Sequence, residues 1–288
     1  MTNNVRVGDV AVFEAEDDWI SKSIALVTNS DVSHAALVYK EMTFAEMGLS
    51  GIQSNPFVVD EKAGRKVYFL RMTPEKNVAP IVAAAQKYLD AKVEYDKPSL
   101  YLLAGYLIYR MVRKPTAKWK NAADLIIAAA ILAVDKMINQ VKNNGKKVMV
   151  CSQFVYQCYF DCGKEYRINV RQLDTALNNN QFYLADLMKE TSYSKFDEVS
   201  FNTAKSEDEL AKDLYDALTE NVDESALLSK KDLFSTASKA KVFIEKLEDL
   251  LKIMSLDMPI DALFVTPVDL LKNSSNLELK ETLRITRK

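Results

Sequence analysis

The sequence predicts an α+β fold in which an antiparallel sheet packs on helices, with helical insertions at about 98–145 and 200–258. Short segments that alternate apolar and polar residues indicate strands. Other segments repeat apolar residues every three or four positions, which indicates helices that bury one side. No internal repeat or low-complexity tract interrupts this pattern.

The first part of the chain predicts most of the sheet. Residues 5–13 (VRVGDVAVF) alternate around a Gly-Asp pair, as in a strand with a bend or bulge. Residues 19–28 have helical spacing. Residues 35–39 and 43–47 flank a short polar turn and predict a β-hairpin, and residues 67–72 supply another strand.

The rest of the chain predicts mainly helices. Residues 78–89 have helical spacing, and two helices are expected between Leu100 and about Asn143. A short strand over residues 147–150 then leads into a helix that begins at Cys151. Charged helical segments continue to about Met254. The sequence TPVDLLKNSSNLELKETLRI ends the pattern with a short helix that starts at Thr-Pro and a final strand.

Composition narrows the class of protein. Hydrophobic residues make up 48% of the 288 residues, charged residues make up 27%, and the formal net charge is −2. These values are typical of a soluble globular protein, and the absence of a basic excess argues against a nucleic-acid partner. The first residues lack a basic segment followed by an apolar one, so no secretory signal is indicated and a cytoplasmic location is expected.

Two stretches are unusually apolar, Leu100–Val112 and Leu125–Val134. Both are shorter than the roughly 20 residues needed to span a bilayer. Three alternatives remain for this insertion: a second core, a lid over an acyl-binding groove, or a hairpin in contact with a membrane or lipid through Leu100–Val134. The second core is the commonest role of such helices.

The three cysteines, Cys151, Cys158 and Cys162, fall within one predicted helix, which is unlike a disulfide framework. They could form a zinc site only together with His34, and no C-x-x-C pair supports such a site. We therefore expect neither a metal nor a cofactor. A cysteine inside a helix is usually a small buried hydrophobic residue, and Cys158 and Cys162 fit that description.

Cys151 differs because it stands where a strand ends and a helix begins. Unpaired N–H groups and the helix dipole favour a thiolate at this position, and the same N–H groups, including that of Cys151, could stabilise an oxyanion. A nucleophilic thiol needs a group that takes and returns its proton. His34 is the only histidine in the chain, although a lone histidine on a strand is more often structural.

The predicted hairpin offers a partner for His34. With a turn near residues 40–42, antiparallel pairing brings Glu46 to within a residue or two of the start of the His34 strand. Glu46 is therefore a candidate to hold the second ring nitrogen, and Gln53 or Asn55 are alternatives.

Several short motifs, in this order, resemble the circularly permuted papain-like cysteine peptidases of the NlpC type, particularly the YiiX-like group. In that family the histidine precedes the cysteine, the histidine opens a strand and the cysteine opens a helix. The matching segments are Gly8-Asp9, TNSDVSH (28–34), AEMGLSGIQSNPF (45–57), Tyr95-Asp96, CSQFVYQCY (151–159) and TPVDLLKNS (266–274). The family is often exported and compact, whereas no secretory signal is expected here and the sequence carries the apolar insertion.

The resemblance implies a papain-like fold in one permuted catalytic domain over residues 1–288, with Cys151, His34 and Glu46 as the catalytic residues. It also implies that Tyr95 and Asp96 line the substrate site, although the same dipeptide could be a polar turn. Ser152, next to the nucleophile, is expected to contact substrate as well.

The leading hypothesis is a cysteine hydrolase that cleaves an amide bond in a peptide or a cell-wall-like peptide through a thioester acyl-enzyme. One alternative is transfer or cleavage of a lipid acyl group, as in the related lecithin:retinol acyltransferase group, which the apolar insertion favours. A second alternative is a binding module without catalytic activity.

Overall fold

The computed structural model describes two compact units. The first comprises Met1–Ser99, Asn144–Thr175 and Asp257–Lys288, and the second comprises Leu100–Asn143 and Ala176–Leu256. Both segments of the second unit overlap the expected insertions, while a single catalytic domain over 1–288 stays a prediction. The residues described are 4–18, 21–22, 24–25, 28, 30–48, 50–93, 124, 127–128, 130–131, 134–135, 138–139, 151–170, 230–253 and 265–288.

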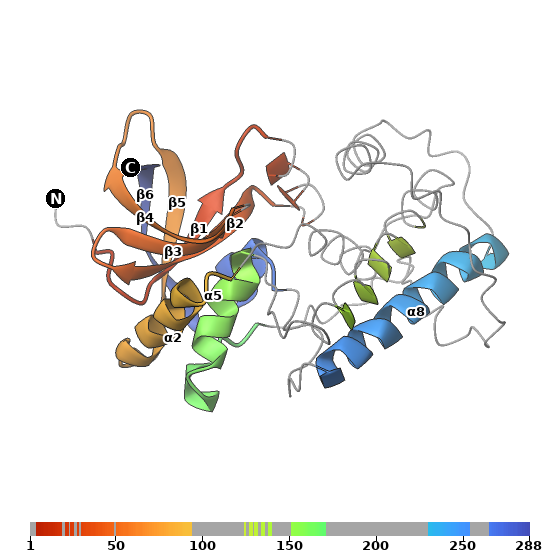
Figure 1. Ribbon diagram of the computed structural model, residues 1–288. Helices are drawn as coiled ribbons and strands as arrows, with labels where there is room; N and C mark the ends of the chain where they lie inside the picture. Colours follow the sequence, from red (N-terminus) through yellow and green to blue (C-terminus); the bar gives the residue numbers. More distant parts are fainter. Residues whose placement is uncertain are drawn as a thin grey trace. The chain divides into compact units, whose positions relative to one another are not determined.

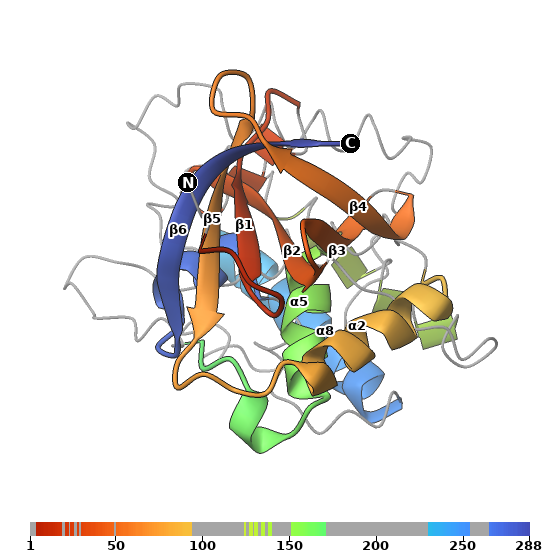
Figure 2. The ribbon, with the colours of Figure 1, turned by 90° about the vertical axis from the view of Figure 1, so that its left-hand side faces the viewer.

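Six antiparallel strands of the first unit form a closed barrel, in the order β1-β2-β3-β4-β6-β5 (Figures 1 and 2). The predicted mixture of an antiparallel sheet with helices is therefore confirmed, and the sheet also closes on itself. In Figure 2 the dark blue β6 runs beside β5 and reaches β4, which closes the ring. The strands are β1 (Val10–Glu14), β2 (Val32–Lys40), β3 (Thr43–Gly48), β4 (Gly51–Val59), β5 (Arg65–Met72) and β6 (Leu277–Arg287).

The first strand begins later than its alternating pattern predicts. Residues 5–9 precede β1 as a turn, in which the N–H of Arg6 donates to the Asp9 carboxylate at 2.8 Å. Gly8 has a φ of +89°, which L side chains rarely adopt, and a Cβ there would meet the side chain of Val78. The bend expected at the Gly-Asp pair is thus a turn that leads into the strand.

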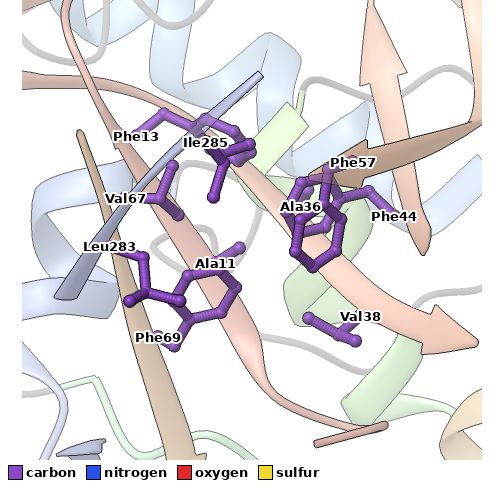
Figure 3. Packing of buried hydrophobic residues seen from close by; sticks show 10 residues of the cluster. All are labelled: Ala11, Phe13, Ala36, Val38, Phe44, Phe57, Val67, Phe69, Leu283 and Ile285. Carbon is purple, nitrogen blue, oxygen red and sulfur yellow. The ribbon is translucent and has the colours of Figure 1, made fainter. Parts of the chain in front are cut away.

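The interior of the barrel is apolar. Phe44 stacks on Phe57 with ring centroids 4.1 Å apart, and Phe13 meets Phe44 edge-on at 5.3 Å. Because side chains alternate between the two faces of a strand, each strand contributes one or two inward-facing apolar residues to this core. Figure 3 shows the cluster, which consists of Ala11, Phe13, Ala36, Val38, Phe44, Phe57, Val67, Phe69, Leu283 and Ile285.

Two helices of the first unit were expected and are present. Helix α2 (Ala79–Asp90) has proline in its first turn, where the missing N–H has no intrahelical partner to lose. Helix α5 (Cys151–Phe160) packs on β2 and β3 and buries Phe154, Val155, Cys158 and Tyr159. The Tyr88 hydroxyl donates to Asp161 at 2.6 Å and ties α2 to the chain just after α5. The strand expected at 147–150 lies outside the described residues.

The segment that leads into β6 starts with a reciprocal cap. The Thr266 N–H and hydroxyl both donate to the Asp269 carboxylate, at 3.0 and 2.7 Å, and the Asp269 N–H donates back at 3.2 Å. A short π-helix, η2 (Asp269–Asn273), follows. The predicted short helix after Thr-Pro and the final strand are both confirmed.

In the second unit, several apolar side chains of the described part of the insertion are buried. Residues 124–139 contain helical positions, and ion pairs join Asp124 to Lys239 and Asp135 to Lys246 of α8 (Lys230–Ile253). Burial of these apolar side chains supports the second-core alternative for this part of the insertion. The buried side chains are Ile127, Ala128, Ala130, Val134, Ala240, Phe243, Leu247 and Leu250. Within the described ranges, every helix is too short or too polar to cross a membrane.

Candidate functional site

Cys151 is the first residue of α5, and its side chain meets the imidazole of His34 on β2. Burial alone would raise the pKa of the Cys151 thiol. Hydrogen bonds from His34 and from the backbone N–H groups of Ala35 and Ser152, together with the charge of His34, outweigh burial and lower that pKa. The arrangement favours a thiolate at the start of the helix.

The other side of the imidazole meets Glu46 on β3. The distance from His34 Nε2 to Glu46 Oε2 is 2.6 Å, so Nδ1 is the ring nitrogen left to face Cys151. Burial would lower the pKa of His34, but the bonds to Cys151 and Glu46 and the charges of both groups raise it to about 9. The contact therefore lowers the pKa of the thiol and raises the pKa of the imidazole, which favours a thiolate–imidazolium pair.

The strand pairing explains why these side chains meet. Glu46 is the cross-strand partner of Ala36, two residues beyond His34 on β2. Both side chains therefore point to the same face and lie on a diagonal of the hairpin. Phe13 is the direct partner of His34 on β1, and the two rings pack with centroids 5.2 Å apart. The expected hairpin and the closeness of Glu46 to His34 are confirmed.

Glu46 is itself surrounded by donors. The Asn55 amide donates to Oε1 at 2.7 Å, and Arg287 Nη2 donates to Oε2 at 2.6 Å. Burial would raise the pKa of Glu46, but the bonds and charges of His34, Arg287 and Asn55 lower it to about 2. A carboxylate that is 3% exposed thus stays ionised.

Six inward-facing side chains, one from each strand, gather at this end of the barrel, and we call them the barrel-end cluster. The guanidinium groups of Arg65 and Arg287 each lie 5.1 Å from the centroid of the Phe13 ring. Arg65 also donates to the Glu14 carbonyl at 2.6 Å. The members of the cluster are Phe13, His34, Glu46, Asn55, Arg65 and Arg287.

The two arginines were not expected from the sequence. Arg287 reaches Glu46 because Phe57 on β4 pairs with Arg287 on β6, and no local pattern reveals that register. The only sequence signal is the alternation of Leu283, Ile285 and Arg287 on one face of the last strand.

The remaining predicted site residues have different outcomes. Of the two alternatives to Glu46, Asn55 bonds Glu46 rather than His34, and Gln53 donates to the Ser50 hydroxyl at 2.7 Å. The Ser152 hydroxyl is fully buried and has no hydrogen-bond partner among the described residues. Its expected contact with substrate stays a prediction. Tyr95-Asp96 lies outside the described residues.

The other two cysteines have environments that disfavour a thiolate. Burial and the Asp161 carboxylate raise the pKa of Cys158 well above its ordinary value. Burial and the carboxylates of Asp161 and Glu165 raise the pKa of Cys162 to about 11. Cys162 is partly exposed like Cys151, but the pKa values of the two thiols are shifted in opposite directions.

In the part of the chain that the structure describes, no group of three or more His, Cys, Asp or Glu side chains is placed to hold a metal ion. Cys151, His34 and Glu46 instead form a linear relay of thiol, imidazole and carboxylate. Such a relay can generate a nucleophile and move a proton. Comparison of the chain with protein-family models, with curated proteins and with solved structures finds no match in any of the three.

Proposed function

We propose that this protein is a cysteine hydrolase that cleaves an amide bond, with Cys151 as nucleophile, His34 as proton carrier and Glu46 as the group that orients His34. The observation that carries the proposal is the contact of one imidazole with a helix-opening thiol on one side and a buried carboxylate on the other. Each of these residues alone has an ordinary structural explanation, but together they supply the parts of a nucleophilic relay.

The reaction would proceed in two steps. Cys151 Sγ attacks the substrate carbonyl carbon, and the imidazolium of His34 gives its proton to the departing amine, which leaves a thioester on Cys151. Water then attacks the thioester, His34 accepts one proton from that water, and the acid and the free thiolate are released. Glu46 keeps Nε2 of His34 occupied throughout, so that Nδ1 faces the reacting atoms.

The proposal includes the family. The order of His34 before Cys151, the strand that carries one and the helix that begins with the other agree with a permuted papain-like peptidase of the NlpC type. A closed antiparallel barrel with a helix packed against it is compatible with that fold. A peptide or cell-wall-like peptide is the substrate class that this resemblance favours.

The two partly exposed cysteines provide the first test. We expect limiting iodoacetamide at pH 7 to alkylate Cys151 at least about a hundredfold faster than Cys162, because the pKa of Cys151 is lowered whereas that of Cys162 is raised to about 11. The rates are read by mass spectrometry of the proteolytic peptides. His34→Ala should remove most of the difference, and Lys40→Ala, an exposed position on the same strand, should leave it unchanged.

Turnover is measured with short D- and L-peptide amides and with acyl esters, and acid-quenched intact mass detects a thioester on Cys151. Amide cleavage that Cys151→Ser abolishes supports the proposal. Equal alkylation of Cys151 and Cys162, without an effect of His34→Ala, would exclude it. Turnover of acyl esters without turnover of amides would contradict amide cleavage and favour the alternative of acyl transfer or ester cleavage.

A further inference from the structure

One oxygen of Glu46 is shared by two cations. His34 Nε2 and Arg287 Nη2 both lie 2.6 Å from Oε2, while Asn55 occupies Oε1. A carboxylate oxygen that accepts two charge-assisted hydrogen bonds divides its negative charge between them. The electrostatic attraction between Glu46 and protonated His34 is therefore weaker than it would be if His34 were the sole cationic partner of Glu46.

The position of Arg287 is set by packing. Its backbone pairs with Phe57 across the β4–β6 ladder, and its guanidinium lies over the Phe13 ring, which also packs against His34. The side chain is 37% exposed, yet its tip reaches the buried carboxylate. Arg287 therefore belongs to the barrel-end cluster through its strand pairing, its contact with Phe13 and its bond to Glu46.

The charged groups around His34 come from four elements. Cys151 belongs to α5, Glu46 to β3, Arg287 to β6 and Arg65 to β5. Arg65 donates to the Ser33 hydroxyl at 3.2 Å and to the Glu14 carbonyl, and it forms an ion pair with Glu16. Of the two arginines, Arg287 is thus the one bonded to Glu46.

We propose that Arg287 is a positioning residue that shares Glu46 with His34 and limits how tightly this carboxylate holds the imidazolium, so that His34 gives up its proton more readily to the leaving group. The inference rests on the proposed cysteine hydrolase function. Without Arg287, Glu46 would still be held by Asn55 and would place its charge on His34 alone. The imidazolium would then become a weaker acid.

The single histidine makes a direct test available. In untagged protein labelled with 13C in the histidine ring, one NMR signal reports the titration of His34. We expect Arg287→Met, which removes the guanidinium but keeps an unbranched side chain at this position, to raise the titration midpoint by about half a pH unit or more. Arg287→Lys should restore most of the wild-type midpoint. Arg284→Met should leave the midpoint unchanged. Arg284 occupies an exposed position of the same strand, and its guanidinium donates to the Gly64 carbonyl.

Kinetics separate this role from a purely structural one. A peptide p-nitroanilide needs a proton for its departing amine, whereas the matching p-nitrophenyl ester does not. We expect Arg287→Met to slow acylation by the anilide several-fold and to leave acylation by the ester within about twofold of wild type. A variant that merely loosens the fold would slow both substrates.

The outcomes distinguish the two proposals. An unchanged or lower midpoint in Arg287→Met, in a protein whose Cys151 reacts rapidly and depends on His34, would overturn the role of Arg287 alone. A lower midpoint would mean that Arg287 only holds Glu46 in place. Slow, His34-independent alkylation of Cys151 in the wild type would overturn the proposed function, and the inference with it.

Discussion

His34 and Glu46 lie on a diagonal of the β2–β3 hairpin, and 2.6 Å separates Nε2 of the one from Oε2 of the other. Twelve positions along the chain and one tight turn suffice to bring them together. Because a shift of one residue would send one of the two side chains to the opposite face, the contact depends on this register. The carboxylate, rather than the imidazole, also accepts hydrogen bonds from Asn55 and Arg287.

Acid stability should depend on Glu46. Its pKa in the folded protein, about 2, lies below the ordinary value of 4.5, so ionised Glu46 stabilises the fold above pH 4.5 and this contribution is lost as pH falls through about 2. We expect urea unfolding of the wild type to show a loss of stability of about 2 to 3 kcal/mol over this range that Glu46→Gln lacks. Glu41→Gln, at an exposed residue of the hairpin turn, should retain the wild-type dependence. Parallel curves for wild type and Glu46→Gln would contradict the assignment.

Amide cleavage should decline at alkaline pH. The pKa of His34 is raised to about 9, so the imidazolium that protonates the departing amine is present below pH 9 and is lost above it. We expect kcat/KM for an amide to fall tenfold per pH unit beyond about pH 9, while alkylation of the Cys151 thiolate by iodoacetamide continues. A decline centred near pH 6.5, the ordinary value for histidine, would contradict the ion pair.

A buried ion pair outside the site should control stability without affecting chemistry. Asp9 is fully buried and accepts from Arg71 Nε at 2.7 Å and from Nη2 at 2.9 Å. Arg71→Met leaves this carboxylate without its cation. We expect this variant to lower the free energy of unfolding, measured with urea, by about 3 to 5 kcal/mol. Arg71→Met combined with Asp9→Asn should recover part of the loss. Arg6→Met, which removes only an exposed pair with Glu75, should cost less than about 1 kcal/mol.

In the same Arg71→Met protein, below its unfolding transition, Cys151 should react with iodoacetamide at the wild-type rate. Neither Asp9 nor Arg71 belongs to the barrel-end cluster. A changed alkylation rate in the folded variant would show that this ion pair influences the reactivity of Cys151.

The Ser152 hydroxyl should be dispensable for stability. It is fully buried and has no hydrogen-bond partner within the described residues, so its burial disfavours the fold. We expect Ser152→Ala to keep or to raise the free energy of unfolding by up to about 1 kcal/mol. Ser33→Ala, which removes a buried hydroxyl that accepts from Arg65, should instead lower it by about 1 kcal/mol. A clear destabilisation by Ser152→Ala would mean that this hydroxyl has a partner.

The sequence predicted what is local. The β2–β3 hairpin follows from alternation around a polar turn, and with it the approach of Glu46 to His34. Helix α5, which begins at Cys151, follows from the helical spacing of the apolar residues after that position. Both depend on interactions within about fifteen residues, where periodicity and turn chemistry dominate.

What the sequence could not predict depends on distant segments. Closure of the barrel places β6 between β4 and β5, and this pairing alone brings Arg287 to Glu46, 241 residues away in the chain. The start of β1 at Val10 was also missed, because the chain turns at Gly8, whose φ is +89°. The choice between Gln53 and Asn55 depends on a diagonal contact, because Gln53 is the direct partner of Glu46 but Asn55 bonds it.

The closed barrel also has a consequence for the time course of folding. Contacts between segments far apart in sequence form late, because a long loop must be closed before they contribute any stability. The relay needs a hairpin, a helix that follows a long insertion, and a last strand, so it exists only in the fully assembled first unit. A partly folded chain would carry Cys151 as an ordinary thiol. Under the proposed function, the nucleophile would therefore form only when the first unit is completely folded.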